Sequence, residues 1–170
     1  LTSELSWYPF TVKKYVRNQV KSMVWSTSVD LKTTIILNAH LDVVPGHPSQ
    51  FILTEQNGHW YGRGAMDMKF AIATFIIALQ KLYRETGQLP SVAIMITSDE
   101  EKGGANGVGH LVGEVGYSAD VVLIPDGGAN WHIVQNAKGV IHIKVTTCGV
   151  ASHASRPWEG KSAIDELMDK

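Results

Sequence analysis

Several residues that could do chemistry stand directly after runs of apolar residues. His40 and Asp42 follow the apolar run 34–38. Residues two apart in an extended chain point to the same face, so the Asp42 carboxylate can accept the outer N–H of the His40 imidazole. Such a partner fixes the tautomer and makes the imidazole a better metal ligand. Taken alone, such a pair is more often a surface histidine whose hydrogen bonds are satisfied.

Acidic residues recur in comparable places farther along the chain. Asp67 stands at the start of a long apolar segment, where a helix-capping acid would also be expected. Three consecutive acids, residues 99–101, follow another apolar run, and Asp126 follows a third. Adjacent carboxylates repel one another unless a cation gathers them. The alternatives are a solvated acidic loop for residues 99–101 and a turn residue for Asp126.

Considered together, these residues predict a metal site. The carboxyl ends of the strands in an open α/β sheet form one crevice, where binding sites are built. One imidazole and several carboxylates there suit Zn²⁺, with Co²⁺ or Mn²⁺ possible. A carboxylate can bridge two ions about 3.5–4 Å apart. The candidate ligands are His40, Asp67, Glu101 and Asp126.

The adjacent glutamates Glu100 and Glu101 can divide two tasks between them. One carboxylate can bind the metal, while the other stays free and handles the proton of the activated water. This division accounts for paired acids at the end of a strand better than a solvated loop does.

An α/β fold is needed to position these residues. Apolar and β-branched runs predict strands over residues 11–16, 23–26, 34–38, 91–98 and 120–126. Asn57-Gly58 predicts a hairpin turn. Residues 66–86, closed by Gly87, predict a helix that is mostly buried, because apolar residues nearly surround it. With a second helix over residues 104–113, the alternation predicts a sheet covered by helices on both faces.

The pattern changes after Asp126. Residues 131–149 alternate polar and apolar, which is typical of antiparallel strands with one wet face. Residues 160–170 begin a further helix. The sequence therefore predicts a domain boundary near Lys138.

The composition indicates a packed protein without a charged partner. Of 170 residues, 44% are hydrophobic and 18% are charged, which favours a buried core over disorder. The formal net charge of −1, from 15 basic and 16 acidic residues, argues against binding to nucleic acid or an anionic membrane surface. No apolar run is long enough to cross a bilayer. The single Cys148 fits a reducing compartment, and we expect a cytoplasmic protein.

Five motifs in this order resemble one enzyme family: HLDVVPG, YGRGAMDMK, TSDEEKGG, IPDGG and GVASHASRPWEGKSAI. The chain resembles the co-catalytic zinc metallopeptidases, a group that includes aminoacylase, acetylornithine deacetylase, succinyl-diaminopimelate desuccinylase and glutamate carboxypeptidase. The resemblance covers most of the chain from about residue 33 onward. It implies a partial catalytic domain in residues 1–137 and the beginning of a smaller α+β lid and dimerisation domain in residues 138–170.

The resemblance also implies a site with two zinc ions. His40 and Asp126 would be terminal ligands of one ion, and Glu101 would bind the other. Asp67 would bridge the two ions and have a cis peptide bond on its C-terminal side.

Three further residues receive catalytic roles from the resemblance. Glu100 would be the general base, and Asp42 would orient His40. His153 would lie in the smaller domain, reach into the active site of a second copy and stabilise the oxyanion. The resemblance therefore implies a homodimer.

Family members also have a histidine ligand after the smaller domain. The chain is therefore expected to be a fragment truncated at both ends, lacking that ligand; its histidines are His40, His47, His59, His110, His132, His142 and His153. Two functions stay open. The first is a deacylase or carboxypeptidase that hydrolyses amide bonds of N-acyl amino acids or small peptides. The second is an inactive binding domain that keeps the fold. The acyl group or amino acid that would be cleaved is not predicted.

Overall fold

The computed structural model describes residues 3–127, 132–136 and 138–169. The chain divides into two compact units, Leu1–His132 and Ile133–Lys170. The sequence placed this boundary near Lys138. Each unit is described by itself below.

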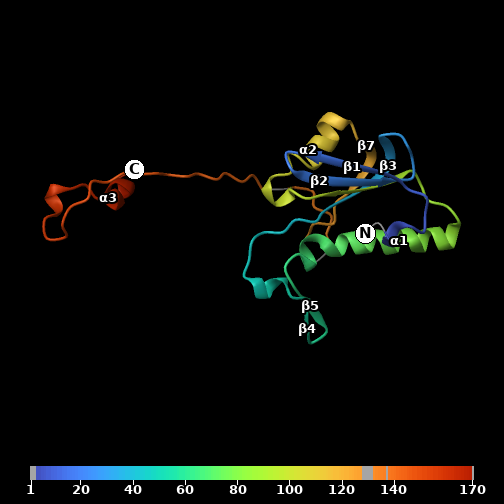
Figure 1. Ribbon diagram of the computed structural model, residues 1–170, viewed down its shortest axis with the longest axis horizontal. Helices are drawn as coiled ribbons and strands as arrows, with labels where there is room; N and C mark the ends of the chain where they lie inside the picture. Colours follow the sequence, from blue (N-terminus) through green and yellow to red (C-terminus); the bar gives the residue numbers. More distant parts are fainter. Residues whose placement is uncertain (1–2, 128–131, 137, 170) are drawn as a thin grey trace. The chain divides into compact units, whose positions relative to one another are not determined.

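The first unit is built on a mixed five-stranded sheet with the strand order β1-β2-β6-β3-β7 (Figure 1). Strands β1 and β2 pair antiparallel, as do β2 and β6, whereas β3 lies between β6 and β7 and is parallel to both. The strands are β1 (Thr11–Arg17), β2 (Val20–Ser26), β3 (Lys32–His40), β6 (Val92–Thr97) and β7 (Ser118–Leu123). The C-terminal ends of the three parallel strands therefore lie along the same rim of the sheet.

Strand β6 lies at the centre of the sheet, and all six of its residues are buried. Because side chains of a strand alternate between faces, Ile94 and Ile96 join one core cluster, while Ala93 and Met95 join another. The first cluster packs against α1 (Phe70–Thr86), and the second packs against residues around α2 (Val108–His110). Figure 1 shows these helices on opposite sides of the sheet. The expected two-sided α/β arrangement is confirmed.

The long helix is buried on one side only. Five of its residues are buried: Ala71, Ile72, Phe75, Ile76 and Leu79. Ile77, by contrast, is 64% exposed. The expectation of a mostly buried helix was wrong, because α1 meets the sheet with one face and no described element covers the other. The helix ends as predicted at Gly87, whose φ of 73° suits a left-handed C-cap.

Two further expectations concern strands. The hairpin is confirmed: β4 (Thr54–Gln56) and β5 (His59–Tyr61) pair antiparallel around Asn57 and Gly58, which both have positive φ. Strand β7 was expected to be interior, but it lies at the edge of the described sheet, and its Val121 and Val122 are each 50% exposed. An apolar run alone does not reveal whether a strand has neighbours on both sides.

The second unit has little regular structure. Residues 138–149 contain no strand, and one antiparallel bridge joins Val150 to Lys161. The antiparallel strands expected here are not observed in the described residues. A strand needs a partner for its backbone hydrogen bonds, and Ile141 remains 85% exposed. The expected terminal helix is present as α3 (Ala163–Met168), where the Ser162 hydroxyl accepts the N–H of Asp165 at 3.2 Å.

Among the described residues, no helix combines the length and the apolar character needed to span a membrane.

Candidate metal centre

The parallel strands bring distant parts of the chain to one rim of the sheet. His40 is the last residue of β3 and pairs with Thr97, the last residue of β6. Glu100 follows β6 by a short loop, and Asp126 follows the end of β7 in the same way. The sheet topology therefore places side chains from three loops next to one another.

Asp67 reaches the same rim from the turn before α1. This turn, η3 (Ala65–Lys69), departs from helical geometry at Asp67 and Met68. The peptide bond between these two residues is cis, as the family resemblance implied. Met68 is 1% exposed, so it anchors the turn in the core while Asp67 faces outward.

His40, Asp67 and Asp126 form a group that could hold a metal ion. One ligand atom from each lies within 4.8 Å of the others. His40 Nε2 is 3.0 Å from Asp67 Oδ1 and 3.8 Å from Asp126 Oδ2. Three of the four ligand candidates from the sequence thus come together.

Glu101, the fourth candidate, does not belong to this group. Its Oε1 accepts the backbone N–H of Val44 at 3.2 Å. Glu100 lies closer to the centre, with Oε2 3.7 Å from His40 Nε2. Glu100, the proposed base, is therefore the glutamate that approaches the imidazole, whereas the carboxylate of Glu101, the proposed ligand, is bonded to Val44.

The orientation of His40 favours a positive charge at the centre. Its Nδ1 lies 3.0 Å from the backbone carbonyl of Asp42. A carbonyl oxygen only accepts, so Nδ1 must carry a proton and donate it. Nε2 then faces the Asp67 carboxylate with either a second proton or a lone pair. A lone pair next to a carboxylate is repulsive unless a cation lies between them, so the geometry fits either an imidazolium or a bound metal ion.

Asp42 acts differently from the expectation. The carbonyl of Asp42, rather than its carboxylate, is the nearer acceptor for His40, because the carboxylate oxygen is 3.4 Å from Nδ1. The carboxylate instead accepts the backbone N–H groups of Glu100 at 3.2 Å and Glu101 at 3.0 Å. Asp42 thereby ties the loop after β3 to the loop after β6.

The electrostatics of the group favour a cation. Burial by itself would lower the pKa of His40, but the Asp42 carbonyl and the carboxylates of Asp42, Glu100 and Asp126 together raise that pKa above its ordinary value. The pKa of Glu100 is also raised, first by burial and then by Asp126, Glu101 and Asp42, against the lowering effect of His40. No lysine or arginine within the described ranges forms a salt bridge with any of these acids.

The donor set therefore fits a divalent ion. An imidazole nitrogen and carboxylate oxygens are ligands that zinc, cobalt and manganese share. A bound ion would satisfy the Nε2 lone pair and offset the repulsion among the acids.

Asp99 has a role that its sequence position did not reveal. The sequence groups it with Glu100 and Glu101 as one of three consecutive acids, but it is 4% exposed. Its Oδ2 accepts the N–H groups of Asn106 at 2.9 Å and Gly107 at 3.0 Å. A Cβ at position 107 would collide with the Asp99 carboxylate and with Thr97. The glycine-rich segment after the acids was the available signal for such a close approach.

His153 lies in the second unit. Its Nδ1 accepts the N–H of Ser155 at 3.2 Å and lies 2.8 Å from the Ser155 hydroxyl. The proposed oxyanion role of His153 therefore stays a prediction.

The chain is similar to several known proteins. A family model described as "Peptidase family M20/M25/M40" matches residues 36–166. A probable succinyl-diaminopimelate desuccinylase of Staphylococcus aureus is 36% identical over 149 residues, covering 79% of this chain and 35% of that protein. A succinyl-diaminopimelate desuccinylase of Bordetella petrii is 26% identical over an alignment of 181 residues, covering 98% of this chain and 47% of that protein. The chain thus spans between a third and a half of the length of these relatives.

Two solved structures have a similar fold. Human carnosine dipeptidase 1 matches with a TM-score of 0.58 and 23% identity, over 74% of this chain and 31% of that protein. A tripeptidase of Staphylococcus aureus matches with a TM-score of 0.60 and 19% identity, over 99% of this chain and 48% of that protein.

Proposed function

The chain belongs to peptidase family M20/M25/M40, and from that premise we propose that it carries part of the active site of a metal-dependent hydrolase of amide bonds. The observation that carries the proposal is the approach of His40 Nε2 to two carboxylates, Asp67 and Asp126, at the rim of the sheet. That arrangement supports a metal site where strand ends of an α/β sheet usually bind ligands.

The proposed substrates are N-acyl amino acids or small peptides. The names of the relatives support this class, since they are called desuccinylases, and the similar structures are a dipeptidase and a tripeptidase. All of these names refer to cleavage of an amide bond in a small molecule. A homodimer in the cytoplasm, with a second copy supplying His153, belongs to the same proposal.

A pair of zinc ions, with cobalt or manganese as alternatives, would supply Lewis-acid activation of a water molecule at this site. His40, Asp67 and Asp126 would hold metal, and Glu101 would join them after releasing the N–H of Val44. The Asp42 carboxylate would hold the loop that carries Glu100 and Glu101 close to His40, because it accepts the backbone N–H groups of both glutamates.

Glu100 would act as the general base. Its carboxylate lies 3.7 Å from His40 Nε2 without belonging to the group of three ligands. A carboxylate that lies beside the metal group without being one of its ligands can take a proton from water and return it to the leaving amine. The proton taken from water would thus end on the amine product.

A binding domain without catalysis is the second candidate. It is favoured by the position of Glu101, whose carboxylate is engaged by Val44 rather than by the group of three. Such a domain could keep the fold and a weak metal site without turnover.

The test uses Glu100→Gln, which keeps the size of the side chain but removes the base. In the whole enzyme we expect hydrolysis of N-acyl amino acids to fall by at least about 100-fold, with metal content unchanged. Glu4→Gln, an exposed residue in η1 (Ser3–Leu5), is the control and should leave turnover unchanged. Full activity of Glu100→Gln would remove Glu100 from the mechanism, and a wild-type protein without hydrolytic activity would favour the binding role.

A further inference from the structure

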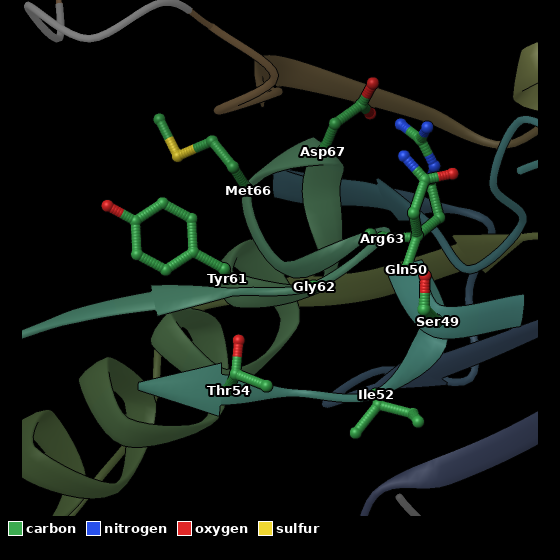
Figure 2. A pocket seen from close by; sticks show the side chains of 10 residues that line it. Ser49, Gln50, Ile52, Thr54, Tyr61, Gly62, Arg63, Met66 and Asp67 are labelled. Carbon is green, nitrogen blue, oxygen red and sulfur yellow. The ribbon is translucent and has the colours of Figure 1, made fainter. Parts of the chain in front are cut away.

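A pocket of about 370 Å³ opens beside the candidate metal centre (Figure 2). Asp67 forms part of its wall, so the pocket and the metal group share a residue. The rest of the wall comes from the segment around η2 (Pro48–Phe51), from the β4–β5 hairpin and from the turn that leads into α1. A molecule bound at the metal group could therefore extend into this pocket.

Arg63 is the only cation among the residues that line the pocket. Its side chain is partly buried, and its Nε is buried without a hydrogen-bond partner. Within the part of the chain that the structure describes, the guanidinium forms no salt bridge and no side-chain hydrogen bond. Figure 2 shows the side chains of Arg63 and Asp67 extending in the same general direction from the turn.

The turn that carries Arg63 is held by close backbone packing. The N–H of Arg63 donates to the carbonyl of Gln50 at 2.6 Å. Gly64 has a φ of +80°, and a Cβ there would press against Val43 and Lys69. On the other side, a Cβ at Gly46 would lie 3.5 Å from Arg63 Nε. The backbone at Arg63 is therefore held where its side chain lines the pocket.

The Nε–H of Arg63 is costly to leave in this state, because it has given up water without gaining a hydrogen-bond acceptor. The planar fork of guanidinium donors matches a carboxylate in a bidentate geometry. The remaining polar residues of the wall are uncharged, apart from Asp67, which faces the metal group. The pocket thus offers one positive charge without a salt-bridge partner, and it shares Asp67 with the candidate metal group.

We propose that Arg63 binds a carboxylate group of the substrate and that this pocket selects substrates carrying one. The inference rests on the proposed function and adds its substrate class: N-acyl amino acids with an anionic end that reaches past Asp67. Such a carboxylate could belong to a dicarboxylic acyl group or to the amino acid.

The experiment measures binding to the zinc-supplemented chain by calorimetry with three probes. N-succinylglycine carries both carboxylates, N-succinylglycinamide keeps only the acyl carboxylate, and N-succinamoylglycine keeps only that of the amino acid. We expect Arg63→Gln to weaken binding of N-succinylglycine by about tenfold or more, as for loss of a charge-assisted hydrogen-bond pair. Arg63→Lys should restore part of the affinity, because the charge returns without the fork.

The two single-carboxylate probes identify the source. If a probe binds Arg63→Gln more weakly than wild type, it carries the carboxylate that Arg63 binds. The second single-carboxylate probe should bind wild type and Arg63→Gln with equal affinity. Arg84→Gln, an exposed arginine near the end of α1, removes the same charge elsewhere and should leave all three affinities unchanged.

Zinc affinity, measured separately for each variant, distinguishes the two proposals. Absence of zinc binding by the wild-type chain contradicts the proposed function, and the probes are then titrated without metal to decide on Arg63. Three results would each overturn the role of Arg63. The first is equal probe affinities for wild type and Arg63→Gln, and the second is no detectable binding of N-succinylglycine to the wild type at millimolar concentration. The third is a loss of zinc binding in Arg63→Gln.

Discussion

The Nε2 atom of His40 lies 3.0 Å from the Oδ1 atom of Asp67, although the two residues come from different elements. The other ring nitrogen of His40 donates to the carbonyl of Asp42. Because Nδ1 is committed to that carbonyl, Nε2 is left to face the acids. This relationship is what makes the rim of the sheet a candidate metal centre, and it leads to the first prediction.

Replacing His40 by alanine should remove most of the zinc affinity. We expect the wild-type chain to bind about one zinc ion, weakly, with three protein ligands in place. Loss of a residue that only orients a ligand already costs about 10- to 100-fold in metal affinity, so His40→Ala should reach at least the upper end of that range. Zinc titration by calorimetry measures this, with His142→Ala, an exposed histidine of the second unit, as the control. Unchanged affinity in His40→Ala would rule out the proposed centre, and tight binding of two ions by the wild type would contradict the expected single weak site.

Replacing Asp42 by alanine should weaken zinc binding less than His40→Ala does. The carbonyl that holds His40 remains, but the two N–H groups of Glu100 and Glu101 lose their acceptor. We expect a loss of about 10-fold in zinc affinity, at the lower end of the range for residues that orient ligands. Asp42→Asn keeps one acceptor oxygen and should fall between wild type and Asp42→Ala. The same zinc titration measures both, and a loss for Asp42→Ala as large as that for His40→Ala would show that Asp42 is itself a ligand.

Gly107→Ala should destabilise the first unit. Its added Cβ would collide with the Asp99 carboxylate, which is buried and bonded to two backbone N–H groups. Overpacking of this kind costs about 1–3 kcal/mol in the free energy of unfolding. Gly113→Ala is a matched control, because a Cβ there meets nothing within 4 Å. Urea unfolding followed by circular dichroism should show a lower midpoint for Gly107→Ala only; equal midpoints would mean that the loop relaxes without cost.

The Tyr15–Tyr117 pair should make folding sensitive to alkaline pH. The two hydroxyl groups lie 3.0 Å apart, and Tyr117 is 2% exposed. Burial, and then the hydrogen bond to Tyr15, raise the pKa of Tyr117 above its ordinary value. Its contribution to stability is therefore complete below the ordinary tyrosine pKa of about 10 and is lost as pH rises beyond it, because only the unfolded chain then releases the proton.

Urea unfolding between pH 8 and pH 11 tests this sign. One proton released on unfolding corresponds to a slope of about 1.4 kcal/mol per pH unit above the ordinary pKa. Tyr117→Phe should reduce the slope, while Tyr61→Phe, an exposed tyrosine of β5, should not. An identical slope in wild type and Tyr117→Phe would show that the buried hydroxyl does not titrate differently in the folded state.

Most secondary structure of the first unit could be predicted from short stretches of sequence. The apolar run before His40, the Asn57-Gly58 turn and the Gly87 cap are local signals, because they depend on side-chain period and backbone preference over a few residues. The candidate ligands His40, Asp67 and Asp126 could also be found, because each stands where a local pattern ends.

Other features depend on contacts between distant segments. No local pattern could show that Val121 would lie at an edge, or that an apparent strand around Ile141 would find no partner in the described chain. The family resemblance suggested roles for Glu100 and Glu101. Their backbone, however, is held by the Asp42 carboxylate, and the Glu101 carboxylate accepts the N–H of Val44; both partners come from another loop.

The sequence by itself determined which residues could bind a metal and which strands would carry them, since both are written in residue types and their spacing. The tertiary structure decided which of those residues meet, which nitrogen of His40 faces the acids, and that Arg63 lies unpaired beside them. Strand order and loop packing bring these atoms together across the sheet, and such long-range contacts are not encoded in any single stretch of the chain.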